Sequence, residues 1–456
     1  MAGLARLARA GHNGLPFPLG SMPRRTHPQL AALVAGICVA MVVAPLRAAE
    51  PWLRVLVLEA PSLRLRAASP SGGLRVLDER GQQLGLEPSG AELRFEAQRQ
   101  QKELWFEAVP EAQGPDRDPG LWLGARHYRG RLQLRRQGGQ LQVVNHVPVE
   151  TYLPSVVGSE MPASWPEAAL KAQAVAARTY ALKARKPAAA FDLKATVASQ
   201  VYKGVEAETA STWGAVNQTR GLVLTFGDAL IDAVFHSSSG GATESSGDLW
   251  TRHLPYLVSV PDFDHASPVH QWSKPLDGPL LRRAFPELDQ VLAIEVLSRT
   301  PTGRVKQARA VGRGGQQVLL SGAQLRSRLG LRSTWVRFEL APTKTSSVEP
   351  FGLTASHAPL GWPAPPPPLP AFSLPQARPL PGAAVQLVAV GRGYGHGIGM
   401  SQWGALALAQ RGESFEAILR HYYRGVQLES YGALAQRARP QPGLKPEAWQ
   451  AMAPRL

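Results

Sequence analysis

The chain has 456 residues, of which 44% are hydrophobic and 18% charged, a composition that excludes a wholly disordered protein and suffices for a sizeable buried core. At about 150 residues per domain, two or three domains are expected. The 44 glycines and 40 prolines favour turns, short strands and a linker over a helical bundle. The formal net charge of +16 indicates either an anionic partner or a solvated basic surface.

The first 49 residues carry an export pattern. Arg24 and Arg25 precede the uncharged run LAALVAGICVAMVVA (30–44), and the small pair Ala48 and Ala49 follows it. About 15 apolar residues are few for a membrane span of about 20, whereas Arg47 lies where a cleavage site prefers a small residue. A cleaved signal peptide and an uncleaved membrane anchor at residues 1–49 both remain open, and we expect the rest of the chain in the periplasm or the cell wall.

Export changes how the charge and the cysteine content are interpreted. Residues 1–49 hold five arginines and no acid, so the remainder keeps +11 of the +16. An exported basic chain meets an anionic wall or membrane face rather than nucleic acid. The one cysteine, Cys38, lies inside the apolar run, which leaves the exported part without a disulfide or a thiolate metal site.

Residues 50–147 are predicted to be rich in β-strands. The region consists of short segments with alternating apolar and polar residues, and Gly138 and Gly139 form a two-residue hairpin signal between the last two of them. The expected strands are LRVLVLE (53–59), LRLRA (63–67), ELRFEA (92–97) and the two halves of RLQLRRQGGQLQVVN (131–145).

Helical patterns follow this region. VETYLPSVVGSE (149–160) predicts a short helix that ends near Gly158, and Ser164 with Glu167 three residues later predicts a capping box at the start of a second helix. One face of that second helix carries small or apolar residues at helical spacing, which indicates a packed core: Leu170, Ala174, Ala177 and Ala181.

Strands and helices then alternate to the C-terminus, which predicts an α+β fold: an antiparallel-rich sheet with a few packed helices, preceded by the β-rich segment. The expected elements are strands in GLVLTF (221–226), LIDAVFHSSSGG (230–241) and LPYLVSV (254–260), a hairpin of 308–312 with 316–320, a helix at 321–330, a strand at 385–390, and helices at 401–410 and 415–423. Residues 357–382 form a proline-rich excursion, and residues 431–456 form a polar tail.

Glu160 is the first candidate functional residue. It stands at the C-terminal end of the short helix, where the helix dipole is negative, and Met161 and Pro162 follow it. Both the dipole and the apolar surroundings favour the protonated carboxyl, which suits a proton donor. A solvated glutamate at a helix end fits the same residues.

Arg178 and the run HSSSGG (236–241) each leave several interpretations open. Arg178 lies on or beside the small-residue face of its helix, so it either extends outward to solvent or pairs with a carboxylate or an anionic ligand. The run places His236 before three hydroxyls, which permits a serine nucleophile with a histidine base, a hydrogen-bonding wall for a sugar, or a structural turn.

The run GRGYGHGIGMSQWGA (391–405) is the second concentrated signal. Its alternating glycines allow a ligand or another strand to approach the backbone closely, and they leave the ring of His396 uncovered. The run does not satisfy the dinucleotide pattern GxGxxG, and the chain has neither a phosphate-binding GK[ST] nor a zinc-binding HExxH motif. No cofactor and no metal are expected.

Five blocks in order resemble the SpoIID/LytB domain, the family of stage II sporulation protein D and the amidase enhancer LytB. They cover residues 148–430 in outline and are ETYLPSVVGSEMPASWPEAALKAQAVAARTYAL (150–182), QVYKG (200–204), FHSSSGGATESSGDLW (235–250), LPYLVSV (254–260) and GRGYGHGIGMSQWGA (391–405). The resemblance implies a peptidoglycan lytic transglycosylase, which cuts the glycan between N-acetylmuramic acid and N-acetylglucosamine and closes a 1,6-anhydro ring.

The resemblance also assigns roles to residues. The catalytic glutamate of the family falls on Glu160. The positions that would line or buttress the glycan groove are Arg178, Tyr180, Gln200, Tyr202, His236, Ser237, Glu244, Asp248, His396, Ser401 and Gln402. Some members carry two cysteines of a zinc site before the QVYKG block, but Lys194 and Ser199 stand at those positions here, so that site should be missing.

Two functions from different classes follow from the resemblance. The first is the transglycosylase with Glu160 as general acid and base. The alternative is a non-catalytic wall-binding protein that enhances a separate N-acetylmuramoyl-L-alanine amidase. The expected partners are therefore peptidoglycan glycan strands and, for the alternative, a cell-wall amidase.

Overall fold

A computed structural model describes residues 50–68, 72–100, 102–110, 118–342 and 385–437. All of them belong to one compact unit of the chain, Ala48–Leu456. The predicted export segment (1–49), the proline-rich excursion (357–382) and most of the polar tail (438–456) lie outside the described residues. Within the described part, no helix is both long and apolar enough to cross a membrane.

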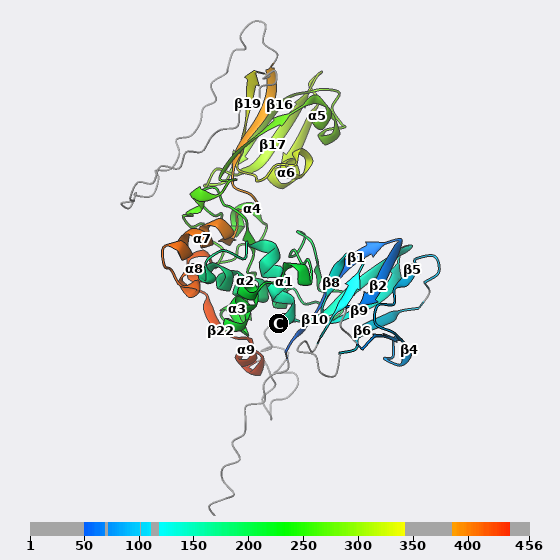
Figure 1. The fold of residues 1–456 in the computed structure, drawn as a ribbon. Coiled ribbons are helices and arrows are strands. Elements are labelled where there is room, and N and C mark those ends of the chain that lie inside the picture. The colour runs from blue at the N-terminus through cyan, green and yellow to red at the C-terminus, as the bar shows by residue number, and fades with distance from the viewer. Residues whose placement is uncertain (1–49, 69–71, 101, 111–117, 343–384, 438–456) are drawn as a thin grey trace, which may run out of the picture. The chain divides into compact units, whose positions relative to one another are not determined.

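The first hundred described residues form two antiparallel-rich sheets, as the alternating pattern predicts (Figure 1). The larger sheet has the strand order β11-β1-β10-β9-β6-β3-β4, and the smaller has the order β5-β2-β7-β8. Gly138 and Gly139 both adopt positive φ, 56° and 80°, which closes the β9–β10 hairpin. The strands are β1 (Trp52–Ala60), β2 (Ser62–Ala67), β3 (Leu74–Leu77), β4 (Gln83–Glu87), β5 (Leu93–Glu96), β6 (Leu104–Ala108), β7 (Leu121–Leu123), β8 (Arg126–Tyr128), β9 (Arg131–Gln137), β10 (Gln140–Pro148) and β11 (Leu193–Lys194).

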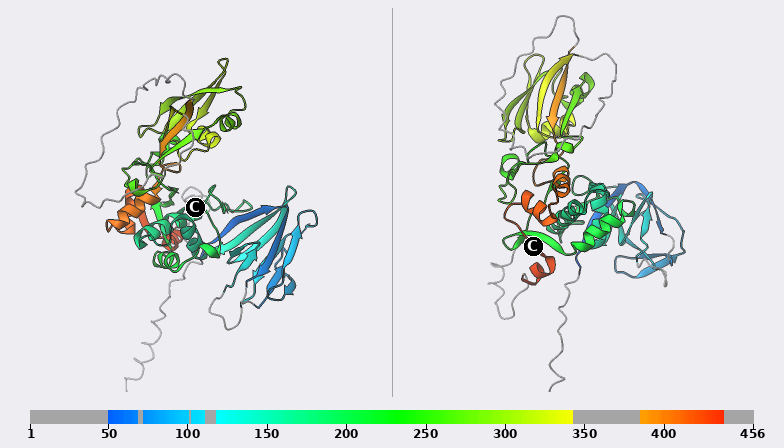
Figure 2. Two further views of the ribbon diagram at one scale, coloured as in Figure 1. Left: turned by 45° about the horizontal axis from the view of Figure 1, so that its top comes forward. Right: turned by 60° about the vertical axis from the view of Figure 1, so that its left-hand side comes forward.

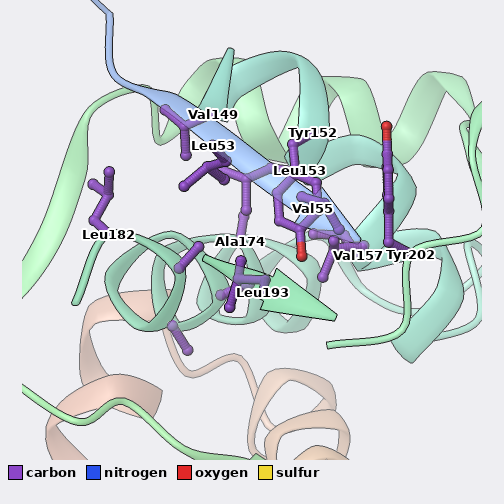
Figure 3. Close-up of a cluster of buried hydrophobic side chains, with 14 of the residues drawn as sticks. Leu53, Val55, Val149, Tyr152, Leu153, Val157, Ala174, Leu182, Leu193 and Tyr202 are labelled. Atoms are coloured by element: carbon purple, nitrogen blue, oxygen red, sulfur yellow. The ribbon is translucent and has the colours of Figure 1, made fainter. Parts of the chain in front are cut away.

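Helix α2 (Glu167–Lys183) is the centre of the next part of the fold. It contacts α1 (Val149–Glu160), α3 (Ala210–Gln218), α7 (Gln402–Gln410) and α8 (Phe415–Tyr422), and the views in Figure 2 show these helices grouped around it. Its predicted small-residue face is buried, because alanines let the neighbouring backbones approach closely. Figure 3 shows side chains of α1 and α2 packed with β1 and β11 in one hydrophobic cluster.

Two local predictions are wrong. Helix α2 begins at Glu167 with Pro166 as its N-cap, and Ser164 makes no cap, because a residue that precedes proline is driven toward extended backbone and keeps 164–166 out of the helix. The apolar run 254–260 forms no strand. The side chains of Leu254, Tyr256 and Leu257 are buried. The backbone of this run is irregular and hydrogen-bonds to the segment 243–246 instead of to a sheet.

Short strands bring the C-terminal blocks beside the helices. β12 (Leu222–Phe226) pairs with β13 (Ala229–Leu230) and with β22 (Gln427–Ser430), and β14 (Phe235–His236) pairs in parallel with β21 (Met400–Ser401). The segment predicted as one strand over 230–241 thus contains only two short ones. The smaller elements of this part are the 3-10 helices Val205–Ala207 and Asp264–Ala266, α4 (Ser246–Leu249) and α9 (Tyr431–Arg437).

A second hydrophobic core is built from residues 271–342 and 385–392. Its two three-stranded sheets have the orders β16-β17-β18 and β15-β20-β19, and α5 and α6 belong to the same group of elements (Figure 1). The predicted hairpin and the helix capped by Ser321 are confirmed. The elements are β15 (Gln271–Leu276), α5 (Gly278–Ala284), β16 (Val291–Arg299), β17 (Val305–Gly312), β18 (Gln317–Ser321), α6 (Gly322–Leu329), β19 (Val336–Pro342) and β20 (Val385–Arg392).

Candidate functional site

Glu160 is the last residue of α1, and its carboxylate is held from two other segments. Oε1 accepts a hydrogen bond of 2.9 Å from the backbone N–H of Val201, and Oε2 accepts one of 3.2 Å from Nε2 of Gln402. Gln402 is 242 positions away in the chain, so the fold brings the V-x-x-E-M-P block and the glycine-rich block together. The residue as a whole is half-buried.

The electrostatics of Glu160 favour its acid form. Burial raises the pKa of this carboxyl above its usual 4.5, and the hydrogen bonds from Val201 and Gln402, with the nearby Lys203 ammonium, only partly oppose the shift. This is the direction that the sequence predicts from the helix end and the apolar residues that follow. Among the described residues, the hydrogen bonds to this carboxyl come from a backbone N–H and an amide, and neither donor is an acid.

The side chains of Gln200 and Tyr202 explain why Val201 donates to Glu160. Gln200 is buried and bonded to both Tyr152 and the carbonyl of Ala177, and the Tyr202 hydroxyl donates to Asn145 at 2.9 Å. Both flanking side chains thus point into the core, and this fixes the backbone between them. Both side chains are buried and bonded within the protein, on either side of the Val201 N–H that donates to Glu160.

Arg178 is fully buried, which settles the choice that the sequence leaves open. Its Nε and Nη2 donate to the two carboxylate oxygens of Glu150 at 2.9 and 2.7 Å. Nη1 donates to the carbonyl of Leu222 at 3.1 Å, and Nη2 also reaches the carbonyl of Val216. Arg178 therefore supports the junction of α1, α2 and β12 from inside and presents no atom to a ligand.

The start of α7 places Gln402 against Glu160. The hydroxyl of Ser401 caps the helix by accepting the N–H of Gly404 at 3.2 Å, as the sequence predicts. Gly404 has no room for a side chain, because a Cβ there would lie 1.8 Å from Oδ1 of Asp262 and 2.0 Å from the hydroxyl of Tyr422. This close approach fixes the helix terminus that carries Gln402.

His236 and His396 lie together behind this helix start, with ring centroids 5.3 Å apart. His396 donates from Nε2 to the carbonyl of Phe235 and accepts the N–H of Ile398 at Nδ1, which defines its neutral tautomer. Burial lowers the pKa of both rings, that of His396 to about 4, so both are uncharged at neutral pH. Since β14 also pairs His236 with Ser401, the end of α1, the HSSSGG run and the glycine-rich block lie next to one another.

Two of the three hydroxyls of the HSSSGG turn bond within the protein. Ser238 donates to Asp264, and Ser239 donates to Asp262, and both carboxylates are buried. For these two serines the bonds fit the structural-turn interpretation rather than a nucleophile. The sequence does not single out these two aspartates, because nothing in the DFDHAS segment (262–267) separates a buried acid from an exposed one.

The remaining predicted positions are spread around this centre. Tyr180 is half-buried near Ser199, and burial raises the pKa of its hydroxyl. Glu244 is buried; its N–H donates to the carbonyl of Gly397, and its carboxylate contacts Thr302. Ser237 and Asp248 are half-buried. Within the described residues, Gln402 is the one predicted groove position that hydrogen-bonds to Glu160.

The zinc site of some family members does not fit this chain. Lys194 is an exposed end of β11, and its N–H donates to the hydroxyl of Ser199 at 3.2 Å. An ammonium group is no zinc ligand, and thiolates are missing. The described ranges also contain no group of three or more His, Cys, Asp or Glu side chains arranged to hold a metal ion.

Comparison with known proteins gives matches across the site. A family model described as Stage II sporulation protein matches residues 137–226. Stage II sporulation protein D of Bacillus subtilis (strain 168) is 30% identical over 316 residues, which cover 64% of this chain and 77% of the relative. The protein of the same name from Bacillus amyloliquefaciens is 31% identical over 313 residues, covering 62% and 75%. Amidase enhancer of Bacillus subtilis (strain 168) is 33% identical over 306 residues, covering 61% of this chain and 40% of the relative.

Proposed function

This chain belongs to the SpoIID/LytB family, and from that premise we propose that it is a lytic transglycosylase of peptidoglycan with Glu160 as its general acid and base. The observation that carries the proposal is the environment of this one carboxyl. It is half-buried, has a raised pKa and is held by donors from the 201 loop and from α7. An acid with such a pKa is protonated over a wider pH range than an ordinary glutamate.

The chemistry needs one carboxyl. Protonated Glu160 gives its proton to the glycosidic oxygen, and the bond between that oxygen and C1 of N-acetylmuramic acid breaks. The C6 hydroxyl of the same sugar attacks C1, and its proton passes to the carboxylate of Glu160, which restores the acid. Because the nucleophile comes from the substrate, the second carboxylate of ordinary glycoside hydrolysis is not required.

Val201 and Gln402 serve this cycle in a defined way. Their N–H groups donate hydrogen bonds to the carboxylate oxygens of Glu160 at 2.9 and 3.2 Å, and these bonds stabilise its negative charge after it gives up its proton. They thereby limit how far burial raises the pKa. A buried carboxyl without these donors would have a higher pKa and would be a weaker acid toward the glycosidic oxygen in the first half of the reaction.

A second candidate is supported by the name of one relative, Amidase enhancer. In that case the protein binds the wall and stimulates a separate amidase without cutting glycan. Incubation of the purified protein with intact and with peptide-stripped peptidoglycan separates the two functions. Products with 1,6-anhydro ends from the wild type, and none from Glu160→Gln, support the transglycosylase.

The same experiment can reject that proposal. If neither protein forms such products, but both bind wall material and accelerate an added N-acetylmuramoyl-L-alanine amidase, the enhancer function is correct. Glu160→Gln is a suitable comparison because its side chain has the same size and keeps an oxygen for the N–H of Val201.

A further inference from the structure

Two tryptophans flank the contact between Glu160 and Gln402. Trp165 lies in the turn between α1 and α2, five positions after Glu160, and Trp403 follows Gln402 in α7. Their ring centroids are 5.2 Å apart with an interplanar angle of 68°, an edge-to-face pair. The same two segments are therefore joined twice, once by the Gln402 amide on the carboxylate and once by this indole pair.

Both indoles remain partly open. Each side chain is half-buried, and neither indole N–H has a hydrogen-bond partner within the described ranges. Three of the other described tryptophans differ in this respect: the Nε1 atoms of Trp105, Trp213 and Trp272 donate to Glu103, Glu208 and the carbonyl of Gly393. An indole that offers both ring surface and a free donor is suited to a ligand that is apolar on one side and hydroxylated at its rim.

Both residues are anchored through their backbone. The N–H of Trp403 donates to the carbonyl of Ser237 at 3.0 Å, and the N–H of Trp165 donates to the carbonyl of Pro162 at 3.0 Å. Trp165 also packs on the main hydrophobic core and lines an open pocket of about 400 Å³ with Leu170 and Gly214. A fixed aromatic surface loses little conformational entropy when a ligand binds.

We propose that Trp165 and Trp403 form a pyranose-binding subsite that positions a sugar of a β-linked N-acetylhexosamine glycan beside Glu160. The inference rests on the proposed function, because it takes the same glycan as ligand. The C–H face of the sugar packs on the exposed indole surface, and the free N–H groups donate to hydroxyl or acetamido oxygens. The two tryptophans are binding residues and take no part in proton transfer.

A glycan fits this surface better than a protein partner does. Two rings with polar neighbours, the Glu160 carboxyl and the Gln402 amide, form a small mixed patch. A stable protein interface needs an apolar core within about 1,200–2,000 Å² of buried surface. A sugar ring needs only one aromatic face and a few hydrogen bonds.

The test measures binding without catalysis. Calorimetric titration of Glu160→Gln full-length protein with a β-1,4-linked N-acetylglucosamine hexamer and with peptide-stripped glycan strands gives a reference affinity. Adding Trp403→Ala or Trp165→Ala should weaken binding by about tenfold or more, whereas Trp403→Phe should retain most of it. Trp122→Ala is the matched control, because Trp122 is also half-buried in an aromatic pair, with His127 on β8, and should leave the affinity unchanged.

Each outcome decides one question. Equal affinities for the two alanine variants and the reference, or no glycan binding by the reference itself, overturn the subsite. If the alanine variants bind glycan normally but no longer bind a cell-wall amidase, the surface is a protein contact instead. Loss of binding in these variants while the wild type forms no anhydro products keeps the subsite and refutes the transglycosylase, so the two proposals fail separately.

Discussion

Replacing Arg178 by methionine should destabilise the protein strongly, because the guanidinium and Glu150 are a buried pair. The variant removes two charge-assisted hydrogen bonds of 2.9 and 2.7 Å and leaves the Glu150 carboxylate with one bond from the N–H of Gly221. The carbonyl of Leu222 also loses a donor. Breaking one side of a buried ion pair costs about 3–5 kcal/mol, so we expect a loss of that size.

The double variant Glu150→Leu, Arg178→Met tests the reasoning further. It removes both charges at once, so no uncompensated carboxylate stays in the core, and it should be more stable than Arg178→Met alone. Urea unfolding followed by circular dichroism measures both free energies. The control is Arg309→Met, since Arg309 and its partner Glu295 are both about a third or more exposed, and its loss should stay within about 1 kcal/mol.

The account of Arg178 would be refuted by two results. One is a loss of less than about 1 kcal/mol in Arg178→Met, which would show that the buried pair is not formed. The other is a double variant that loses the sum of the two single losses, which would show that the two side chains do not interact.

Three further predictions concern Gln402, Gly397 and His236. Gln402→Leu removes a hydrogen-bond donor to the Glu160 carboxylate and should raise the pKa of Glu160 further. The alkaline limb of the pH–rate profile of wall cleavage should then move up by roughly one pH unit, and an unmoved limb would contradict Glu160 as the general acid. Gly397→Ala should lower the free energy of unfolding by at least about 2 kcal/mol, because the new Cβ would lie 2.3 Å from Cζ of the buried Arg304. Gly412 has a similarly positive φ but free space around it, so Gly412→Ala should lose only about 1 kcal/mol in the same urea unfolding experiment. Burial lowers the pKa of the His236 ring well below its usual 6.5, so below pH 6.5 the unfolded chain binds a proton at this ring that the folded chain does not. The free energy of unfolding should therefore fall with decreasing pH by up to about 1.4 kcal/mol per pH unit. An identical pH dependence in His236→Gln would refute this contribution.

The sequence predicts those elements whose signals are local. The Gly138 and Gly139 turn adopts positive φ, and the helices predicted at 321–330 and 401–410 both form, as Gly322–Leu329 and Gln402–Gln410. Each of these patterns is decided by a few adjacent residues, so tertiary packing does not change it. The position of Glu160 at a helix end and the raised pKa of its carboxyl also agree with the local sequence, whereas its catalytic role stays a prediction.

The sequence is less informative where distant packing decides. Ser164 looks like a cap, but Pro166 two positions later starts the helix after it. The partner of Arg178 is Glu150, 28 positions earlier, and no spacing rule selects it over a ligand. The bond from Val201 to Glu160 involves a backbone N–H, for which a sequence pattern carries no signal. Trp165 and Trp403 come from opposite ends of the domain, and only their contact distinguishes them from other tryptophans.

The most direct test of the central claim is the product chemistry of glycan cleavage in ¹⁸O-labelled water. Wild-type protein and Glu160→Gln are incubated with peptide-stripped peptidoglycan, and the released muropeptides or disaccharides are weighed by mass spectrometry. The account predicts products one water lighter than hydrolysis products, without ¹⁸O, from the wild type and no cleavage by Glu160→Gln. Products that carry ¹⁸O, or equal cleavage by the variant, would contradict it.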